Sequence, residues 1–550
     1  MILKTNEPYP DYMLESIKLV EKKRDYNIKH PVKPMSLKER QEILTKYHPD
    51  YMEGTRRELR IGIDKGQVFY NGIVDLLESA PVLNSEDVDL SKIDYDVDLL
   101  IIGGGGAGTV AALFAYESGV PKDKILIVTK LRHGDANSMM AQGGIQAADR
   151  PNDSPTLHYL DIYGGGHFTN KPELVRALAL DAPRIIEWHE SIGVMYDRTD
   201  DGEFLELSGG GTCRNRMHSC KDYSGMEIMR TIRDCARNLQ IPVLEFCPIV
   251  ELIMDDKGQV AGGVAFNLET YEYYVIRAKA TILATGGSGR LHLSNYPTTN
   301  HYGATGDGLV MAYHVGANLL DLDTIQIHPT GDAYPEPIVG ILSTEKIRGL
   351  GAIPINANGD PFVFPLEPRD VESASIIREC KEGRGIVTPT GMPGVWLDTP
   401  MIDIIHGEGT IASKLSGEVR KFKRFGIDLT KYPILVYPTL HYQNGGVEIN
   451  EKCETRVPGL FAAGEVTGGV HGKNRLMGNS LLDFNVFGRR AGIYAAKYIK
   501  KVKIGKLTLS HLDKYKKMLD EAGIKPKKTA PIILPEYRGE KAISRSLDIF

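Results

Sequence analysis

Apolar residues recur along the chain in short runs that end at glycine, a pattern typical of buried strands that lead into tight turns. The clearest run, VDLLII at 97–102, precedes four glycines, the apolar stretch AGTVAALFAY and a second run, KILIVTK at 124–130. A strand, a glycine-rich turn, a helix and a second strand explain this region better than a membrane span, because glycines interrupt it. Two later runs, AKATILATGG at 278–287 and GLFAAGE at 459–465, repeat the pattern. Together they predict a large α/β protein.

The first turn has the spacing of a dinucleotide site. Gly103, Gly105 and Gly108 permit a tight turn and let backbone N–H groups approach a pyrophosphate at a helix N-terminus. The second strand ends in Thr129-Lys130, where a site for NAD has an acidic residue for the ribose. Because two further strand–glycine elements would converge on the same ligand, we expect FAD, which is longer than NAD and needs a cradle for its isoalloxazine ring.

Composition narrows the function classes. The 550 residues suggest three or four domain-sized units, and the net charge of −5 gives no indication of nucleic-acid binding. The first residues lack the basic and apolar segments of a secretory signal, so we expect a cytoplasmic protein. Six cysteines form no CxxC pair and suit neither disulfides, a metal nor an iron–sulfur cluster. We therefore expect no metal in this chain, and any iron–sulfur cluster would belong to another chain.

The first 93 residues are charged and carry scattered prolines. Ser36 and Glu39 form a capping box that predicts a short helix ending before Pro49. This segment is either an arm wrapped on the main body or a docking element for a partner protein, and the sequence favours neither.

A series of motifs runs in order over about 97–500: IIGGGGAGTVAA, AQGG, ATGGSGR, TGDG, QIHPTG, STEKIRG, PRD, HYQNGG, GLFAAGE and NRLMGNSLL. In these motifs the chain resembles the flavoprotein subunits of fumarate reductase and succinate dehydrogenase and their relative L-aspartate oxidase. The resemblance implies an α/β fold with a Rossmann-like FAD-binding domain, an inserted α+β capping domain, a short C-terminal helical tail and an N-terminal extension. The expected segments are an N-terminal extension (1–93), the FAD-binding domain in two parts (94–321 and 438–500), the capping domain (322–437) and a truncated helical C-terminal region (501–550).

The resemblance also implies which residues hold FAD. They come from the three glycine turns, the end of the second strand and the motifs AQGG, TGDG and NSLL: Gly103, Gly105, Ala107, Gly108, Thr129, Lys130, Ser138, Gln142, Gly143, Gly144, Thr285, Gly286, Asp307, Glu465, Ser480 and Leu481.

One position departs from the membrane-bound members of the family. Those proteins carry a histidine that is bonded covalently to the flavin. Here Asn137 takes that place, and His133 is four residues out of register. We therefore expect noncovalent FAD. Since a covalent flavin favours succinate oxidation, its loss favours fumarate reduction.

The substrate residues lie in glycine- and proline-rich contexts. Arg475 can accept a carboxylate bidentately, and two histidines and a hydroxyl can bind a second one. The resemblance implies that His328, Thr344, His441 and Arg475 hold the two ends of a C4 dicarboxylate.

A second set is implied to move the proton. The resemblance assigns proton donation to Arg369, and it assigns the relay from solvent to Glu345 and Arg348. An arginine pKa normally exceeds ~12, so this role requires a buried Arg369 whose proton is replaced through Glu345.

The implied activity is that of an FAD-dependent oxidoreductase acting on CH–CH bonds. Hydride would pass from FAD N5 to fumarate, or in the reverse direction from succinate. Electrons would come from a separate iron–sulfur subunit, and the chain would be cytoplasmic, peripheral to the membrane through its partners. Two alternatives stay open: an L-aspartate oxidase, for which no ammonium-binding residue can be identified, and a flavin-bearing electron-transfer subunit without turnover of its own.

Overall fold

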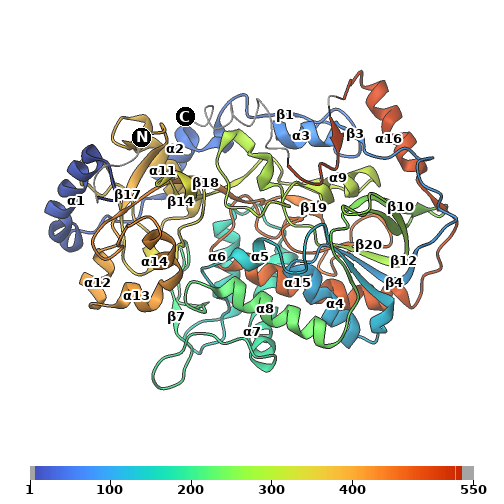
Figure 1. Ribbon diagram of the computed structural model, residues 1–550, viewed down its shortest axis with the longest axis horizontal. Coiled ribbons are helices and arrows are strands. Elements are labelled where there is room, and N and C mark those ends of the chain that lie inside the picture. The colour runs from blue at the N-terminus through green and yellow to red at the C-terminus, as the bar shows by residue number, and fades with distance from the viewer. Residues whose placement is uncertain (1–6, 527, 536–550) are drawn as a thin grey trace.

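An eight-stranded sheet forms the centre of the larger lobe of the molecule, on the right of Figure 1. The structure is a computed structural model that describes residues 7–526 and 528–535. The strand order is β22–β10–β11–β12–β4–β5–β9, and β20 pairs with the end of β12. Four neighbours of this sheet run parallel to β4: β12, β20, β5 and β9. Their bounds are β4 (Tyr95–Ile102), β5 (Ile125–Val128), β9 (Val243–Leu244), β12 (Tyr273–Leu283) and β20 (Leu460–Ala462). The antiparallel strands are β10 (Ile249–Asp255), β11 (Val260–Phe266) and β22 (Leu507–Thr508).

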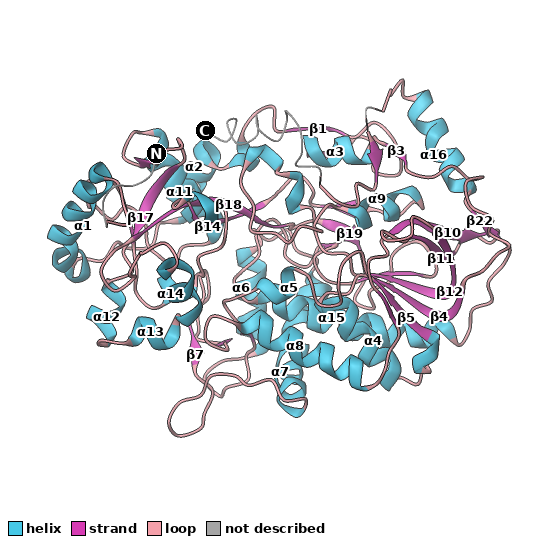
Figure 2. Ribbon diagram, viewed as in Figure 1, coloured by secondary structure: helices cyan, strands magenta, loops and turns pink. Residues whose placement is uncertain are grey.

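The parallel strands bring the three glycine turns to one edge of the sheet. Ile102 at the end of β4 pairs with Leu283 of β12, which pairs in turn with Ala462 of β20. The predicted convergence of three strand–glycine elements is therefore confirmed. Helix α4 (Gly106–Glu117) starts at this edge, and α15 (Asn479–Ile499) packs along it beside the fan of strands in Figure 2.

A five-stranded sheet forms the second lobe, on the left of Figure 1. Its strands are β14 (Gln326–Asp332), β18 (Ile434–Tyr442), β17 (Pro393–Leu397), β15 (Pro354–Ile355) and β16 (Ile386–Val387). Its helices are α10 (Lys346–Gly349), α11 (Arg369–Lys381), α12 (Met401–His406), α13 (Thr410–Lys414) and α14 (Ser416–Lys423). This lobe corresponds to the expected capping segment 322–437. Strand β18 continues past position 437, so one strand joins the expected cap to the segment that follows it.

The N-terminal segment wraps around both lobes. The capping box at Ser36 is present and opens α2 (Leu37–Tyr47), which confirms the predicted helix. Helix α1 (Asp11–Lys29) buries Met13 and Ile17 in the apolar core of the cap lobe, whereas α3 (Asn71–Leu77) belongs to the core of the larger lobe. Of the two interpretations of this segment, wrapping is the one seen in residues 7–93.

Because α1 completes the cap core, we expect Met13→Ala to destabilise the protein by about 2–5 kcal/mol, the usual cost of emptying a buried site. Met13 is 0% exposed, whereas Leu19 on the same helix is 43% exposed. Leu19→Ala is therefore the matched control and should cost much less. Urea denaturation of both variants measures the difference. Equal midpoints would mean that α1 does not contribute to the cap core.

The C-terminal region differs from the expected helical tail. Helix α16 (Ser510–Glu521) is present, but β22 adds to the central sheet, and β23 (Thr529–Ala530) pairs with β3 (Ala80–Pro81). Strands of two residues leave no alternating pattern in a sequence, which is why the prediction missed them. Residues 536–550 of the expected tail lie outside the described residues.

A small sheet, separate from the two large ones, contains β6 (Ile145–Gln146), β8 (Met217–His218) and β7 (Glu206–Leu207). All six cysteines are described and are free thiols; Cys213 is exposed, and the others are buried or half-buried. Among the described helices, none has both the length and the apolar character that a membrane crossing requires.

Candidate active site

A cavity of about 450 Å³ lies along the edge of the central sheet where the glycine turns meet. Most of the predicted cofactor residues line it: Gly103, Gly105, Ala107, Thr129, Lys130, Ser138, Gln142, Thr285, Gly286, Asp307, Glu465, Ser480 and Leu481. Segments from distant parts of the chain therefore line one continuous cavity, as the motifs predict.

The other three predicted residues lie behind the cavity wall, where they permit close packing. A Cβ atom at Gly108 would stand 2.0 Å from the carbonyl oxygen of Gly103. One at Gly143 would meet the Met477 side chain at 2.4 Å, and one at Gly144 would meet the His218 carbonyl oxygen at 2.4 Å. These glycines support the cavity without lining it.

The polar groups of the cavity fit FAD. Gln142 Oε1 and Thr285 Oγ1 are buried and have no hydrogen-bond partner among the described residues, although both residues line the cavity. Buried polar atoms are rarely left unpaired, so these two indicate a polar ligand. Helix α4 begins at the cavity without a side-chain cap, which suits a pyrophosphate.

A carboxylate reaches the end of β5 from a different segment. Lys130 Nζ lies 2.5 Å from Asp307 Oδ2 and 2.8 Å from Thr305 Oγ1. It also donates to the carbonyl oxygen of Ile533, at 2.6 Å. The acidic residue that the second strand lacks in sequence is thus supplied in space by Asp307, at the start of α9 (Asp307–His314).

A group of charged residues lies buried beside the cavity. It consists of His328 on β14, Glu345 and Arg348 around α10, Arg369 at the start of α11, His441 on β18 and Arg475. The rings of His328 and His441 are 5.0 Å apart, and His441 also lines the cavity. His441 therefore connects the charged group to the cofactor cavity.

Hydrogen bonds link the arginines of this group. Arg369 Nε donates to Glu345 Oε2 at 2.8 Å, and Arg348 Nη2 lies 3.4 Å from the same oxygen. Gln326 Oε1 accepts from Arg369 Nη1 at 3.1 Å and from Arg475 Nη2 at 2.9 Å. Gln326 was missed by the sequence analysis. Its position two residues before His328 on a strand, hence on the same face, is the signal that could have revealed it.

Burial shifts the ionisation of the group. It lowers the pKa of Arg475 to about 9, and it lowers the pKa of Arg369 below its ordinary value. Although burial opposes ionisation of Glu345, Arg369 and Arg348 hold the pKa of its carboxyl below the usual range. Burial raises the pKa of Glu372, which pairs with Arg348, to about 8. The group is therefore rich in positive charge and suits an anion.

His328 has the tautomer of a hydrogen-bond donor. The backbone N–H of Thr330 donates to its Nδ1 at 3.2 Å, which leaves the proton of the neutral ring on Nε2. Nε2 is buried without a hydrogen-bond partner among the described residues. Thr344 is buried nearby, but its hydroxyl accepts from the N–H of Lys346 and its N–H donates to Glu418.

Comparison with known proteins identifies the family. The FAD binding domain family matches residues 98–481. One of the polypeptides of the CoM/CoB fumarate reductase of Methanothermobacter marburgensis is 39% identical over 414 residues, which cover 73% of either chain. A solved structure of FrdA from the Escherichia coli quinol fumarate reductase is 32% identical and has a TM-score of 0.70, covering 78% of this chain and 74% of that one.

The chain belongs to the fumarate reductase and succinate dehydrogenase flavoprotein family. It is an FAD-dependent oxidoreductase. An L-aspartate oxidase of Nostoc is also a relative, 36% identical over 409 residues that cover 72% of this chain and 68% of the relative.

In this flavoprotein, Asn137 lines the cavity with all its polar atoms engaged. Its Nδ2 donates to Asn300 Oδ1 at 3.0 Å and to Glu465 Oε2 at 3.1 Å, and its Oδ1 accepts from the N–H of His301 at 2.6 Å. His133 is buried elsewhere, with its Nε2 2.9 Å from Thr109 Oγ1. The segment therefore presents a carboxamide to the cofactor cavity.

Proposed function

We propose that this chain is the catalytic flavoprotein of a fumarate reductase-like enzyme that interconverts fumarate and succinate. The observation that carries the proposal is the buried pairing of Arg369 with Glu345 beside His441, which lines the cofactor cavity. FAD would be held by the predicted cofactor residues, and when bound in its reduced form it supplies hydride from N5.

The charged group supplies the remaining parts of the reaction. Arg475 accepts one carboxylate of the substrate, and His328, Thr344 and His441 bind the other. The free Nε2 of His328 supports this role, because a neutral imidazole donates to a carboxylate without neutralising the arginines. Holding both carboxylates fixes the alkene against the flavin, an effect of proximity and orientation.

Arg369 is the proton donor in this proposal. Its lowered pKa makes the guanidinium a better acid than an exposed arginine, and Glu345 is hydrogen-bonded to it to replace the proton. Arg348 lies on the other side of Glu345 and extends the route. The backbone N–H of Gly210 donates to the second oxygen of Glu345 at 2.8 Å and fixes its orientation.

The domain division follows from this site. We propose that residues 322–437 form a cap that closes over the FAD-binding parts 94–321 and 438–500, with 1–93 as an extension and 501–550 as the C-terminal region. Arg369, Glu345 and His328 come from the cap and Arg475 from the FAD-binding part, so closure assembles the site and excludes water.

An anaerobic assay with purified, FAD-loaded protein tests the proposal. We expect fumarate to oxidise reduced methyl viologen. L-Aspartate consumption with peroxide release, without fumarate reduction, would instead support the L-aspartate oxidase suggested by the Nostoc relative. Neither reaction would favour a flavin-bearing electron-transfer subunit without turnover of its own.

We propose that FAD is bound noncovalently, because a carboxamide at Asn137 has no basic nitrogen for a bond to the flavin. Acid precipitation of the holoprotein should leave the flavin in the soluble fraction. Asn137→His tests the position further: if the register is right, part of the flavin should become acid-insoluble in that variant. A yellow precipitate from the unaltered protein would refute noncovalent binding.

We propose that electrons reach the flavin from a separate iron–sulfur protein, and that the chain works in the cytoplasm, at the membrane only through partners. The scattered positions of the six free cysteines support an external cluster. Copurification from the native source, with iron and flavin quantified, tests this assignment.

A further inference from the structure

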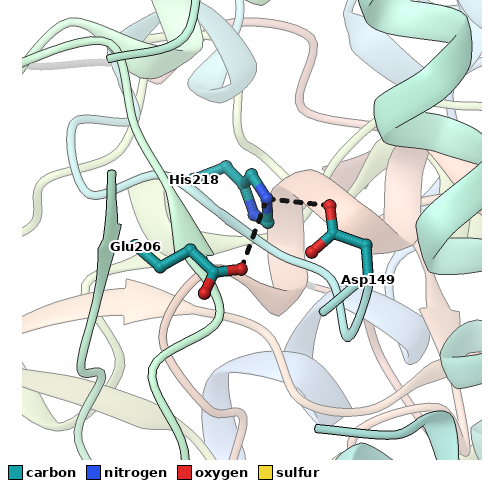
Figure 3. A group of neighbouring side chains, drawn as sticks. All are labelled: Asp149, Glu206 and His218. Carbon is teal, nitrogen blue, oxygen red and sulfur yellow. Dashed lines mark ion pairs between the residues drawn. The ribbon is translucent and has the colours of Figure 1, made fainter. Parts of the chain in front are cut away.

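Three potential metal ligands meet at the small sheet, outside the cofactor cavity and the charged group. His218 ends β8, Glu206 begins β7 and Asp149 follows β6. Their side chains point toward one another in Figure 3, and one ligand atom of each lies within 4.8 Å of the others. The sequence analysis predicted no metal, because the three residues are far apart in the chain and form no ligand motif.

His218 is oriented to accept a cation. Its Nδ1 lies 3.1 Å from the carbonyl oxygen of Arg216, and a carbonyl can only accept, so Nδ1 carries the proton of the neutral ring. The side chain is fully buried, and Nε2 has no hydrogen-bond partner among the described residues. The Nε2 lone pair therefore faces two carboxylates, an arrangement that a cation between them would stabilise.

The distances suit a first-row divalent metal. Nε2 of His218 lies 3.0 Å from Asp149 Oδ2 and 3.7 Å from Glu206 Oε1. Metal–ligand bonds of about 2.1 Å place neighbouring ligand atoms about 3.0 Å apart in an octahedron and about 3.4 Å apart in a tetrahedron. The observed separations lie close to both values, so small side-chain movements would complete a metal site.

The surroundings fix the ligands and leave an entry path. Arg150 Nε lies 3.3 Å from Glu206 Oε2, which holds that carboxylate with its other oxygen toward His218. The Phe204 ring packs edge-on against the imidazole, with centroids 5.0 Å apart. Asp149 lies on the solvent side, so a metal can enter and water can fill its open coordination positions. Partners of this kind orient metal ligands in proteins.

We propose that His218 Nε2, Asp149 Oδ2 and Glu206 Oε1 bind a divalent transition-metal ion. One imidazole and two carboxylates suit Mn²⁺, Fe²⁺ or Zn²⁺ better than soft metals, which prefer sulfur. The ion would join the three strands of the small sheet. Strand β7 leads within four residues to Gly210, whose N–H orients Glu345, and Gly144 directly precedes β6. The metal would therefore stiffen the segment between the cofactor cavity and the charged group.

Metal titration of the full-length, FAD-loaded protein tests the proposal without using turnover. After treatment with EDTA, Mn²⁺ is added and the EPR signal of the free ion is followed. We expect one Mn²⁺ to bind per chain and Zn²⁺ to displace it. Glu206→Gln and Asp149→Asn should each weaken binding by roughly 10- to 100-fold or more, since each removes a ligand.

Glu203→Gln is the matched control, because Glu203 is on the same loop and pairs with the same Arg150 but lies away from His218. It should bind Mn²⁺ as the unaltered protein does. Asp149→Asn lies at the solvent side and should leave folding intact if Glu206→Gln disturbs it. Failure of the unaltered protein to bind Mn²⁺ or Zn²⁺, or binding that both ligand variants retain, would overturn the proposal.

Discussion

Replacement of Arg369 with glutamine is expected to lower fumarate reduction by about 10²- to 10⁴-fold, the range that a general acid contributes. Glutamine can still form hydrogen bonds at this position, but it carries no proton that Glu345 could replace. Arg369 is buried and bonded to Glu345 at 2.8 Å, so no water can take over its role directly. Viologen oxidation measures turnover, and the flavin absorbance of the same sample reports whether the cofactor site is intact.

Arg378→Gln provides the control on the same helix. Arg378 pairs with Glu379, and its side chain is 27% exposed, away from the charged group. This variant should keep both flavin and turnover. If Arg369→Gln also kept its turnover, Arg369 would not be the proton donor, and an electron-transfer role for the chain would gain support.

The sequence predicted the larger lobe well because its signals are local. Each parallel strand is a continuous apolar run that ends at glycine, so β4, β12 and β20 could be recognised one by one. Their meeting at one edge then follows from parallel pairing. The capping box at Ser36 is likewise local. Strands β22 and β23 have two residues each and exist only through their partners, so no local pattern could predict them.

The candidate site divides in the same way. Residues in recognisable motifs were found in advance, and the structure brings most of them together around the cavity or in the charged group. Gln326 was missed, although it stands in such a motif, because its contribution depends on two arginines that are 43 and 149 residues away. The pairing of Lys130 with Asp307 and the grouping of Asp149, Glu206 and His218 are likewise products of tertiary contact. Local sequence carries no signal for such contacts.

Gly103→Ala is expected to reduce FAD binding by about 10-fold or more, since forcing atoms into a packed site costs about 1–3 kcal/mol or more. Gly103 has φ +118°, and a Cβ atom there would stand 2.1 Å from the carbonyl oxygen of Ala284. Relief requires that either the glycine turn or the end of β12 moves. Both carry residues that line the cavity, including Thr285, so either movement opens the cofactor site. The flavin-to-protein ratio of the purified full chain measures the loss.

Gly119→Ala separates this steric effect from backbone strain. Gly119 follows α4, has φ +92°, and has open space where a Cβ would stand. Alanine there carries a similar penalty for a positive φ, about 1 kcal/mol, but it meets no neighbouring atom. Gly119→Ala should therefore retain FAD while losing some stability. If the two variants retained FAD equally, the close approach of Gly103 to Ala284 would not be what shapes the pyrophosphate site. The turn at 103–108 would then contribute through its helix N-terminus alone.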